Sequence, residues 1–165
     1  MGKFISQILF VEAAFMLPAL LISVLERNIP GIWGFALSIV ITAAVASVLY
    51  ALCRHAVRRF YAREGLVCVG MSWIFMSLLG CLPFFMSGEI PNFLDALFEI
   101  VSGFTTTGAS ILSNVEGLSK GMLYWRSFSH WLGGMGVLVF LLAVGERGDK
   151  GSGFTLHLLR AESPG

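Results

Sequence analysis

The chain has 165 residues, of which 56% are hydrophobic and 13% charged, with a formal net charge of +1 and a mean hydropathy of +0.82. Soluble domains average about 45–50% apolar and about 25% charged residues. The composition therefore excludes an ordinary soluble domain and predicts a membrane protein, and the small net charge gives no reason to expect a nucleic-acid partner.

Four apolar segments are long enough to cross a bilayer as helices: residues 4–25, 31–53, 66–86 and 122–145. A helix needs about 20 residues for about 30 Å of hydrocarbon, so the pattern predicts an all-α membrane protein. The first segment contains Glu12 and Pro18 and has no small-residue cleavage site after it, so we interpret it as a retained helix. We expect Glu12 to face the helix bundle, paired or protonated, rather than to line an ion path.

The connecting segments predict an orientation in the membrane. Residues 54–63 contain four arginines and a histidine, whereas residues 87–121 contain four acidic residues and one lysine. By the positive-inside rule, the basic segment and both termini are cytoplasmic and residues 87–121 face outward.

The outward segment contains a candidate pore helix. Asn92 can cap its start, with Asp95 at the third helical position, and Ser102-Gly103 can end it. About eleven residues give a helix of about 16 Å, half a bilayer. A half-length helix followed by polar backbone predicts a re-entrant loop; the alternative is a helix that lies flat on the outer surface, which Asp95 and Glu99 would suit.

Polar backbone follows this helix at Thr105-Thr106-Thr107-Gly108. Unpaired backbone groups are costly in lipid and are tolerated where they line a water-filled path. Rings of backbone carbonyls replace the hydration shell of a cation in potassium channels, and Gly108 supplies the backbone freedom that such a run needs. The run is therefore the candidate ion site.

Several segments together resemble the Trk/Ktr/HKT superfamily of potassium transporters, TrkH-type. They are 95–99 and 102–110 around the run, 125–128 and 130–136 in the last span, and 160–165 at the end. The resemblance implies two leading helices and a basic cytoplasmic loop in 1–60, a first helix–pore loop–helix repeat in 61–147, and a cytoplasmic link to a second repeat in 148–165.

The resemblance also implies residue roles and partners. The carbonyls of Thr105, Thr106, Thr107 and Gly108 would bind potassium, because a glycine at the filter position accompanies potassium in this superfamily and a serine accompanies sodium in some members. The supporting residues would be Glu99, Ala109, Ser110 and Arg126. Implied partners are the lipid bilayer, the other pore repeats, a cytosolic nucleotide-binding regulatory ring and a second copy of the chain, in a bacterial inner membrane. No cofactor is implied besides the transported ion.

Members of the superfamily carry four pore loops in one chain, whereas this sequence contains one. We therefore expect a truncated fragment that does not conduct alone. The alternatives are a homotetrameric cation channel and a non-transporting accessory subunit. No nucleophile–base pair or metal-ligand cluster supports an enzyme.

The last span begins with polar and aromatic residues at helical spacing. Arg126 and His130 are four residues apart, beside Trp125 and Trp131. This pattern predicts an anchor belt at the outer interface, with support of the ion site as the alternative. Gly133, Gly134 and Gly136 predict close helix packing.

Overall fold

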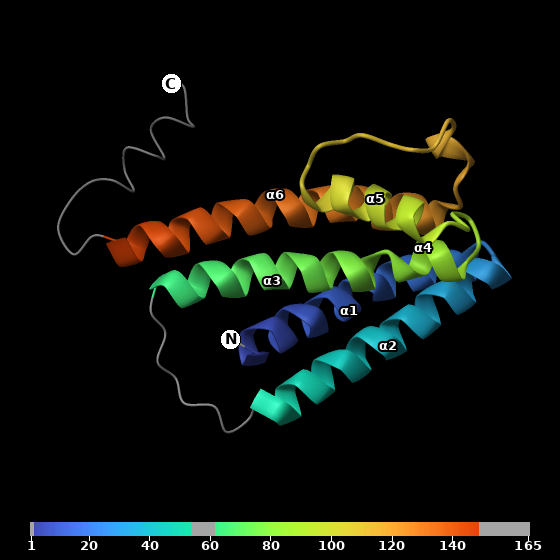
Figure 1. Ribbon diagram of the computed structural model, residues 1–165. Helices are drawn as coiled ribbons and strands as arrows, with labels where there is room; N and C mark the ends of the chain where they lie inside the picture. Colours follow the sequence, from blue (N-terminus) through green and yellow to red (C-terminus); the bar gives the residue numbers. More distant parts are fainter. Residues whose placement is uncertain (1, 54–61, 149–165) are drawn as a thin grey trace.

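The computed structural model describes residues 2–53 and 62–148, and the side chains of residues 2–53 and 67–136. In these ranges the chain forms α-helices and one short 3-10 helix, without strands (Figure 1). Three helical stretches are long and apolar enough to cross a membrane: Gly2–Leu25, Ile29–Cys53 and Val67–Met86. The expected all-α membrane fold is confirmed.

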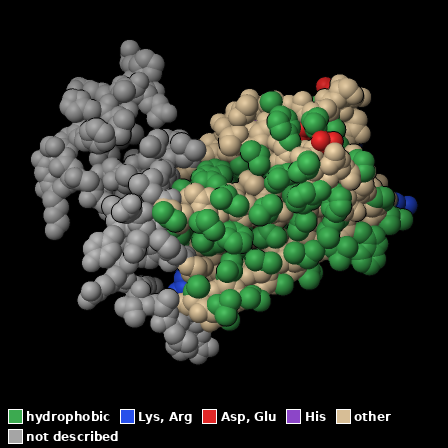
Figure 2. All heavy atoms as spheres, in the orientation of Figure 1, with side chains coloured by type: hydrophobic (Ala, Val, Ile, Leu, Met, Phe, Trp, Pro, Cys, Tyr) green, Lys and Arg blue, Asp and Glu red, His purple; other side chains and the backbone are tan. Residues whose placement is uncertain are grey.

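Helices α1 (Gly2–Leu25) and α2 (Ile29–Cys53) form an antiparallel pair. Small residues of α2 face the bundle, which allows the helix backbones to approach closely; they are Gly31, Gly34, Ser38, Thr42 and Ala46. Large apolar side chains point outward instead, among them Leu21, Trp33, Val40 and Leu52. Figure 2 shows hydrophobic side chains spread over the visible face of the helices, with few charged groups. This surface suits contact with lipid.

The third expected span is broken in two. Helix α3 (Ala62–Gly80) ends before Cys81, and α4 (Leu82–Met86) continues as a single short turn of helix with Pro83 at its start. Proline lacks the backbone N–H that a continuous helix would need and clashes with the preceding turn. Gly80, the last residue of α3, lies inside the bundle, where an added Cβ would meet Glu12 of α1 and Ile100 and Phe104 of α5.

Helix α5 (Phe93–Phe104) enters the bundle beside α3 and α6, and the chain then returns to the end from which it came (Figure 1). Its 12 residues correspond to about 18 Å, which is half a bilayer. Because α5 runs alongside α3 and α6 and packs against both (Figure 1), the alternative of a helix lying flat across the outer ends of the bundle is wrong. The returning segment includes a 3-10 turn, Val115–Gly117, before α6 begins.

Helix α6 (Lys120–Gly148) has 29 residues and includes the fourth expected span, although side chains beyond 136 lie outside the described residues. Its start is tied to the α1–α2 turn, because the Lys120 amide donates to Glu26 Oε2 at 3.0 Å. Glu89 binds the same end of the bundle, accepting from Asn28 Nδ2 at 3.3 Å and Ser119 Oγ at 2.7 Å. Most of the basic loop 54–63, and the tail 149–165, lie outside the described residues.

Candidate functional site: the pore loop

Helix α5, the candidate pore helix, starts as the sequence predicts. The Asn92 side chain accepts a hydrogen bond from the Leu94 amide at 3.0 Å, so Asn92 is the N-cap. Asp95 lies in the first turn, where a negative charge stabilises the helix dipole. In the described part of the chain, Asp95 makes no bond back to the Asn92 amide, so the full capping box does not form.

The helix end differs from the prediction. The Thr107 amide donates to the Ser102 carbonyl at 3.0 Å and the Thr106 amide to the Gly103 carbonyl at 2.9 Å, which is a Schellman motif. Such a motif needs one residue in the left-handed conformation, and Thr106 takes that position with φ +56°. Gly103, which we expected to end the helix, lies inside it. A β-branched residue rarely adopts positive φ, so Thr106 is held in a strained conformation by its surroundings.

All four amides of the run 105–108 donate into the end of α5. Besides the two bonds above, the Thr105 amide donates to the Val101 carbonyl at 2.9 Å and the Gly108 amide to the Ser102 carbonyl at 3.5 Å. The carbonyl oxygens of 105–108 accept no hydrogen bond from any residue described. All four residues are exposed on this chain. The run therefore presents unpaired carbonyl oxygens at its surface, which is the chemistry that a dehydrated cation requires.

Gly108 also has a positive φ, +75°, and an added Cβ there would meet no other atom within 4 Å. Glycine adopts this conformation at no steric cost. The Thr105 hydroxyl donates to the Val101 carbonyl at 2.8 Å and lies 2.8 Å from the Thr107 hydroxyl. These contacts fix two of the threonine side chains along the run.

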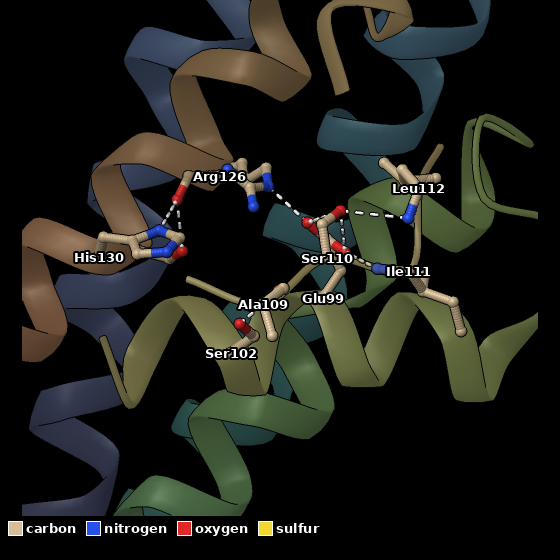
Figure 3. A network of polar contacts seen from close by, with 9 residues as sticks. Glu99, Ser102, Ala109, Ser110, Ile111, Leu112, Arg126 and His130 are labelled. Atoms are coloured by element: carbon tan, nitrogen blue, oxygen red, sulfur yellow. Dashed lines mark hydrogen bonds and ion pairs between the residues drawn. The ribbon is translucent and has the colours of Figure 1, made fainter. Parts of the chain in front are cut away.

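A buried carboxylate supports the segment after the run. Glu99 is 1% exposed, and its oxygens accept hydrogen bonds from the Ser110 hydroxyl at 3.0 Å and the Ile111 amide at 3.2 Å (Figure 3). Arg126 of α6 donates its Nε–H to Glu99 Oε1 and forms an ion pair with it. Glu99 thus joins α5, the returning segment and α6.

Ser102 and Ala109 form a second connection between the helix and the returning segment. The Ser102 hydroxyl donates to the Ala109 carbonyl, and the Ser110 hydroxyl accepts from the Leu112 amide at 3.1 Å (Figure 3). From the sequence, Ser102 has no expected role beyond ending the helix. Its position three residues after Glu99, on the same face of α5, was the available signal.

The predicted anchor belt is wrong for two residues. The Arg126 side chain is 16% exposed and is turned toward Glu99. Trp125 is fully buried, and its Nε1–H donates to the Gly80 carbonyl at 2.9 Å. Trp131 is 53% exposed, as an interfacial residue would be. The His130 ring Nδ1 lies 2.9 Å from the Arg126 carbonyl.

Helices α5 and α6 touch through glycines. A Cβ at Gly133 would lie 2.1 Å from the Phe104 carbonyl oxygen, and one at Gly103 would lie 2.1 Å from Ser129 Oγ. The predicted close packing is therefore confirmed for Gly133. Gly134 and Gly136 have more room, with their nearest atoms at 3.8 and 3.3 Å.

The comparison with protein families matches residues 33–163 to the TrkH model, described as a cation transport protein. The chain belongs to the TrkH family. This is a family of transporters and not an enzyme class.

Individual relatives agree with the family match. The chain is 32% identical to the Trk system potassium uptake protein TrkH of Halomonas elongata over 165 residues, which cover 99% of this chain and 33% of the relative. It is 35% identical to TrkH of Escherichia coli K12 over 134 residues, 80% of this chain and 27% of the relative. An uncharacterized cation transporter of Methanocaldococcus jannaschii is 38% identical over 94 residues, 57% of this chain and 19% of that protein.

The chain thus covers between 19% and 33% of the length of these relatives. The search of solved structures found no match.

Proposed function

We propose that this chain supplies one of four pore loops of a potassium uptake protein. In this proposal the carbonyls of Thr105, Thr106, Thr107 and Gly108 form a quarter of the ion filter. One observation carries the proposal. The amides of residues 105–108 donate hydrogen bonds to carbonyls at the end of α5, whereas the carbonyl oxygens of the same residues accept no hydrogen bond from the described residues. The names of the relatives, which are potassium uptake proteins, support potassium as the ion.

The electrostatics of the loop favour a cation. The run follows the C-terminal end of α5, and the helix dipole places negative partial charge there. The nearest acidic side chain in the network, Glu99, is paired with Arg126 and buried behind the run. The site therefore attracts a cation mainly through carbonyl dipoles, which suits a weakly bound ion that must also leave.

Glu99, Ser110, Ala109 and Arg126 act in this proposal as supports of the filter. They fix the segment just after Gly108 to α5 and α6, so that the carbonyls keep one orientation. Preformed oxygen ligands bind an ion with a smaller ordering cost than mobile ones.

The proposed setting is a bacterial inner membrane with both termini in the cytoplasm and the loop open to the outside. The charge distribution of the connecting segments supports this orientation. The proposed partners are three further pore repeats, a second copy of the protein and a cytosolic nucleotide-binding regulatory ring.

A growth experiment tests the proposal. A strain without potassium uptake systems is given either this chain or an extended protein with all four pore loops, and growth is measured at low potassium. We expect the extended protein to restore growth and the chain alone not to. If the extended protein reaches the membrane without restoring growth, the potassium proposal is wrong; rescue by the chain alone would instead favour a homotetramer.

A further inference from the structure

Helix α5 has an apolar stripe on its exposed side. Leu94, Phe98 and Val101 are 69%, 46% and 37% exposed on this chain. They are four and three residues apart, which places them on one face of the helix. We call these three residues the α5 stripe.

The opposite face of α5 is already packed within the chain, because the helix contacts both α3 and α6. The buried face includes two polar side chains, Glu99 and Ser102, whereas the α5 stripe is wholly apolar. A helix with an apolar exposed face is normally surrounded by lipid or by other protein. The buried residues of α5 are Ala96, Glu99, Ile100, Ser102, Gly103 and Phe104.

The C-terminal end of the stripe argues against lipid as its neighbour. Thr105 follows Val101 by four residues and so continues the same face, and it is also the first residue of the run 105–108 with its unpaired carbonyls. Since α5 is about 18 Å long, this end of the helix lies about halfway across the membrane. Unpaired backbone at that depth is tolerated only where it is buried in protein or lines a water-filled path. The surface shared by the stripe and the run therefore does not face lipid.

The side chains of the stripe argue against water. Leu94, Phe98 and Val101 have no polar side-chain atom, and apolar area left in water costs about 25 cal/mol per Å². The Thr105 hydroxyl is used within the chain, since it donates to the Val101 carbonyl at 2.8 Å and lies 2.8 Å from the Thr107 hydroxyl. The neighbour that fits this surface is an apolar protein surface.

We propose that the α5 stripe packs against an apolar membrane-spanning helix of an adjacent pore repeat in the extended protein. This inference rests on the proposed function, because an assembly of several pore loops places another repeat beside the run 105–108. The aligned parts cover 33% and 27% of the two TrkH relatives, so those proteins have the additional chain that such a contact requires.

This contact gives α5 a second support. On its buried face, the ion pair between Glu99 and Arg126 joins α5 to α6 of the same repeat. On its exposed face, the α5 stripe joins the helix to the adjacent repeat. The end of α5, and with it the run 105–108, is then fixed in position relative to the neighbouring pore loop.

Collisions of a spin label with oxygen test this interface in the extended protein. The native cysteines are replaced by alanine, a nitroxide is attached at Phe98→Cys or Leu37→Cys, and the protein is placed in lipid vesicles. Molecular oxygen concentrates in the membrane and reports contact with lipid, whereas a water-soluble nickel complex reports contact with water. Leu37 of α2 is the matched control, because it is 43% exposed on this chain, close to the 46% of Phe98.

We expect oxygen to collide several-fold less often with the label at Phe98→Cys than with the label at Leu37→Cys, and the nickel complex to collide rarely with both. Equal oxygen collision rates at the two positions, whatever their level, would overturn the interface. Frequent collisions of the nickel complex at Phe98→Cys would also overturn it, because the stripe would then line a water-filled path.

Val101→Cys gives a second position on the stripe if a label at Phe98 prevents folding, which circular dichroism detects as a loss of helix. The same low rates are expected there. The collision rates do not depend on transport. A lipid-exposed label in a protein that takes up potassium contradicts the interface alone, whereas a covered label in a protein that takes up no potassium contradicts the potassium proposal alone.

Discussion

Arg126 of α6 forms an ion pair with Glu99 of α5, and the Glu99 side chain is completely inaccessible to solvent. The same carboxylate accepts hydrogen bonds from Ser110 and the Ile111 amide. One side chain therefore joins α5 and the returning segment to α6.

Removing this carboxylate should destabilise the loop. Glu99→Ala leaves Arg126 without its partner and two donors of the returning segment unpaired, and breaking a buried pair costs about 3–5 kcal/mol. We expect a loss of this size in the free energy of unfolding, measured by chemical denaturation in detergent. Glu116→Ala is the control, since Glu116 is exposed on the 3-10 turn and should change stability by about 0.5 kcal/mol or less. Equal effects of the two variants would contradict the account.

The contact between Gly133 and Phe104 should not tolerate a methyl group. In Gly133→Ala the new Cβ would lie 2.1 Å from the Phe104 carbonyl oxygen, so α5 must move away from α6. Overpacking of this kind costs about 1–3 kcal/mol, and we expect a lower Tm and slower potassium uptake by the extended protein. Gly134→Ala is the neighbouring control, because its Cβ would meet only Thr106 Cγ2, at 3.8 Å. A Gly133→Ala protein as stable as Gly134→Ala would refute the close packing.

Replacing the strained Thr106 by glycine should increase the stability of the protein. Thr106→Gly relieves a positive φ of 56° that a β-branched residue adopts at a cost of about 1–3 kcal/mol. Glycine lowers the free energy of unfolding by about 0.5–1 kcal/mol, because it has more freedom in the unfolded chain. The net effect should be an increase of about 1 kcal/mol in the free energy of unfolding. Thr105→Gly, at a φ of −82°, should lower stability instead. The measurement is the free energy of unfolding of both variants, and two changes of the same sign would contradict the helix-end geometry.

Local patterns in the sequence predicted much of this fold. Uninterrupted apolar runs predicted α1 and α2, and Asn92 predicted the start of α5, because a helix cap depends on residues close in the chain. The position of Pro83 could have indicated the break between α3 and α4, but a proline near the end of a span is also compatible with one continuous helix.

The tertiary contacts of the site were harder to predict. Trp125 and Arg126 are residue types that are common in an interfacial belt. Their contacts with Gly80 of α3 and Glu99 of α5 show that both side chains turn inward. The end of α5 was predicted at Gly103 because glycine favours positive φ. Gly103 instead lies inside the helix, close to Ser129 of α6, and the left-handed position falls on Thr106.

The central claim, that the run 105–108 forms part of a potassium filter, is tested most directly by the ratio of potassium to sodium uptake in the extended protein with Gly108→Ser. Gly88→Ser is a matched control, since Gly88 has nearly the same φ, +77° against +75°, and an added Cβ meets no atom within 4 Å at either position. The backbone strain is thus similar in the two variants. We predict that Gly108→Ser lowers the ratio while Gly88→Ser leaves it unchanged; an unchanged ratio in Gly108→Ser would contradict the filter assignment.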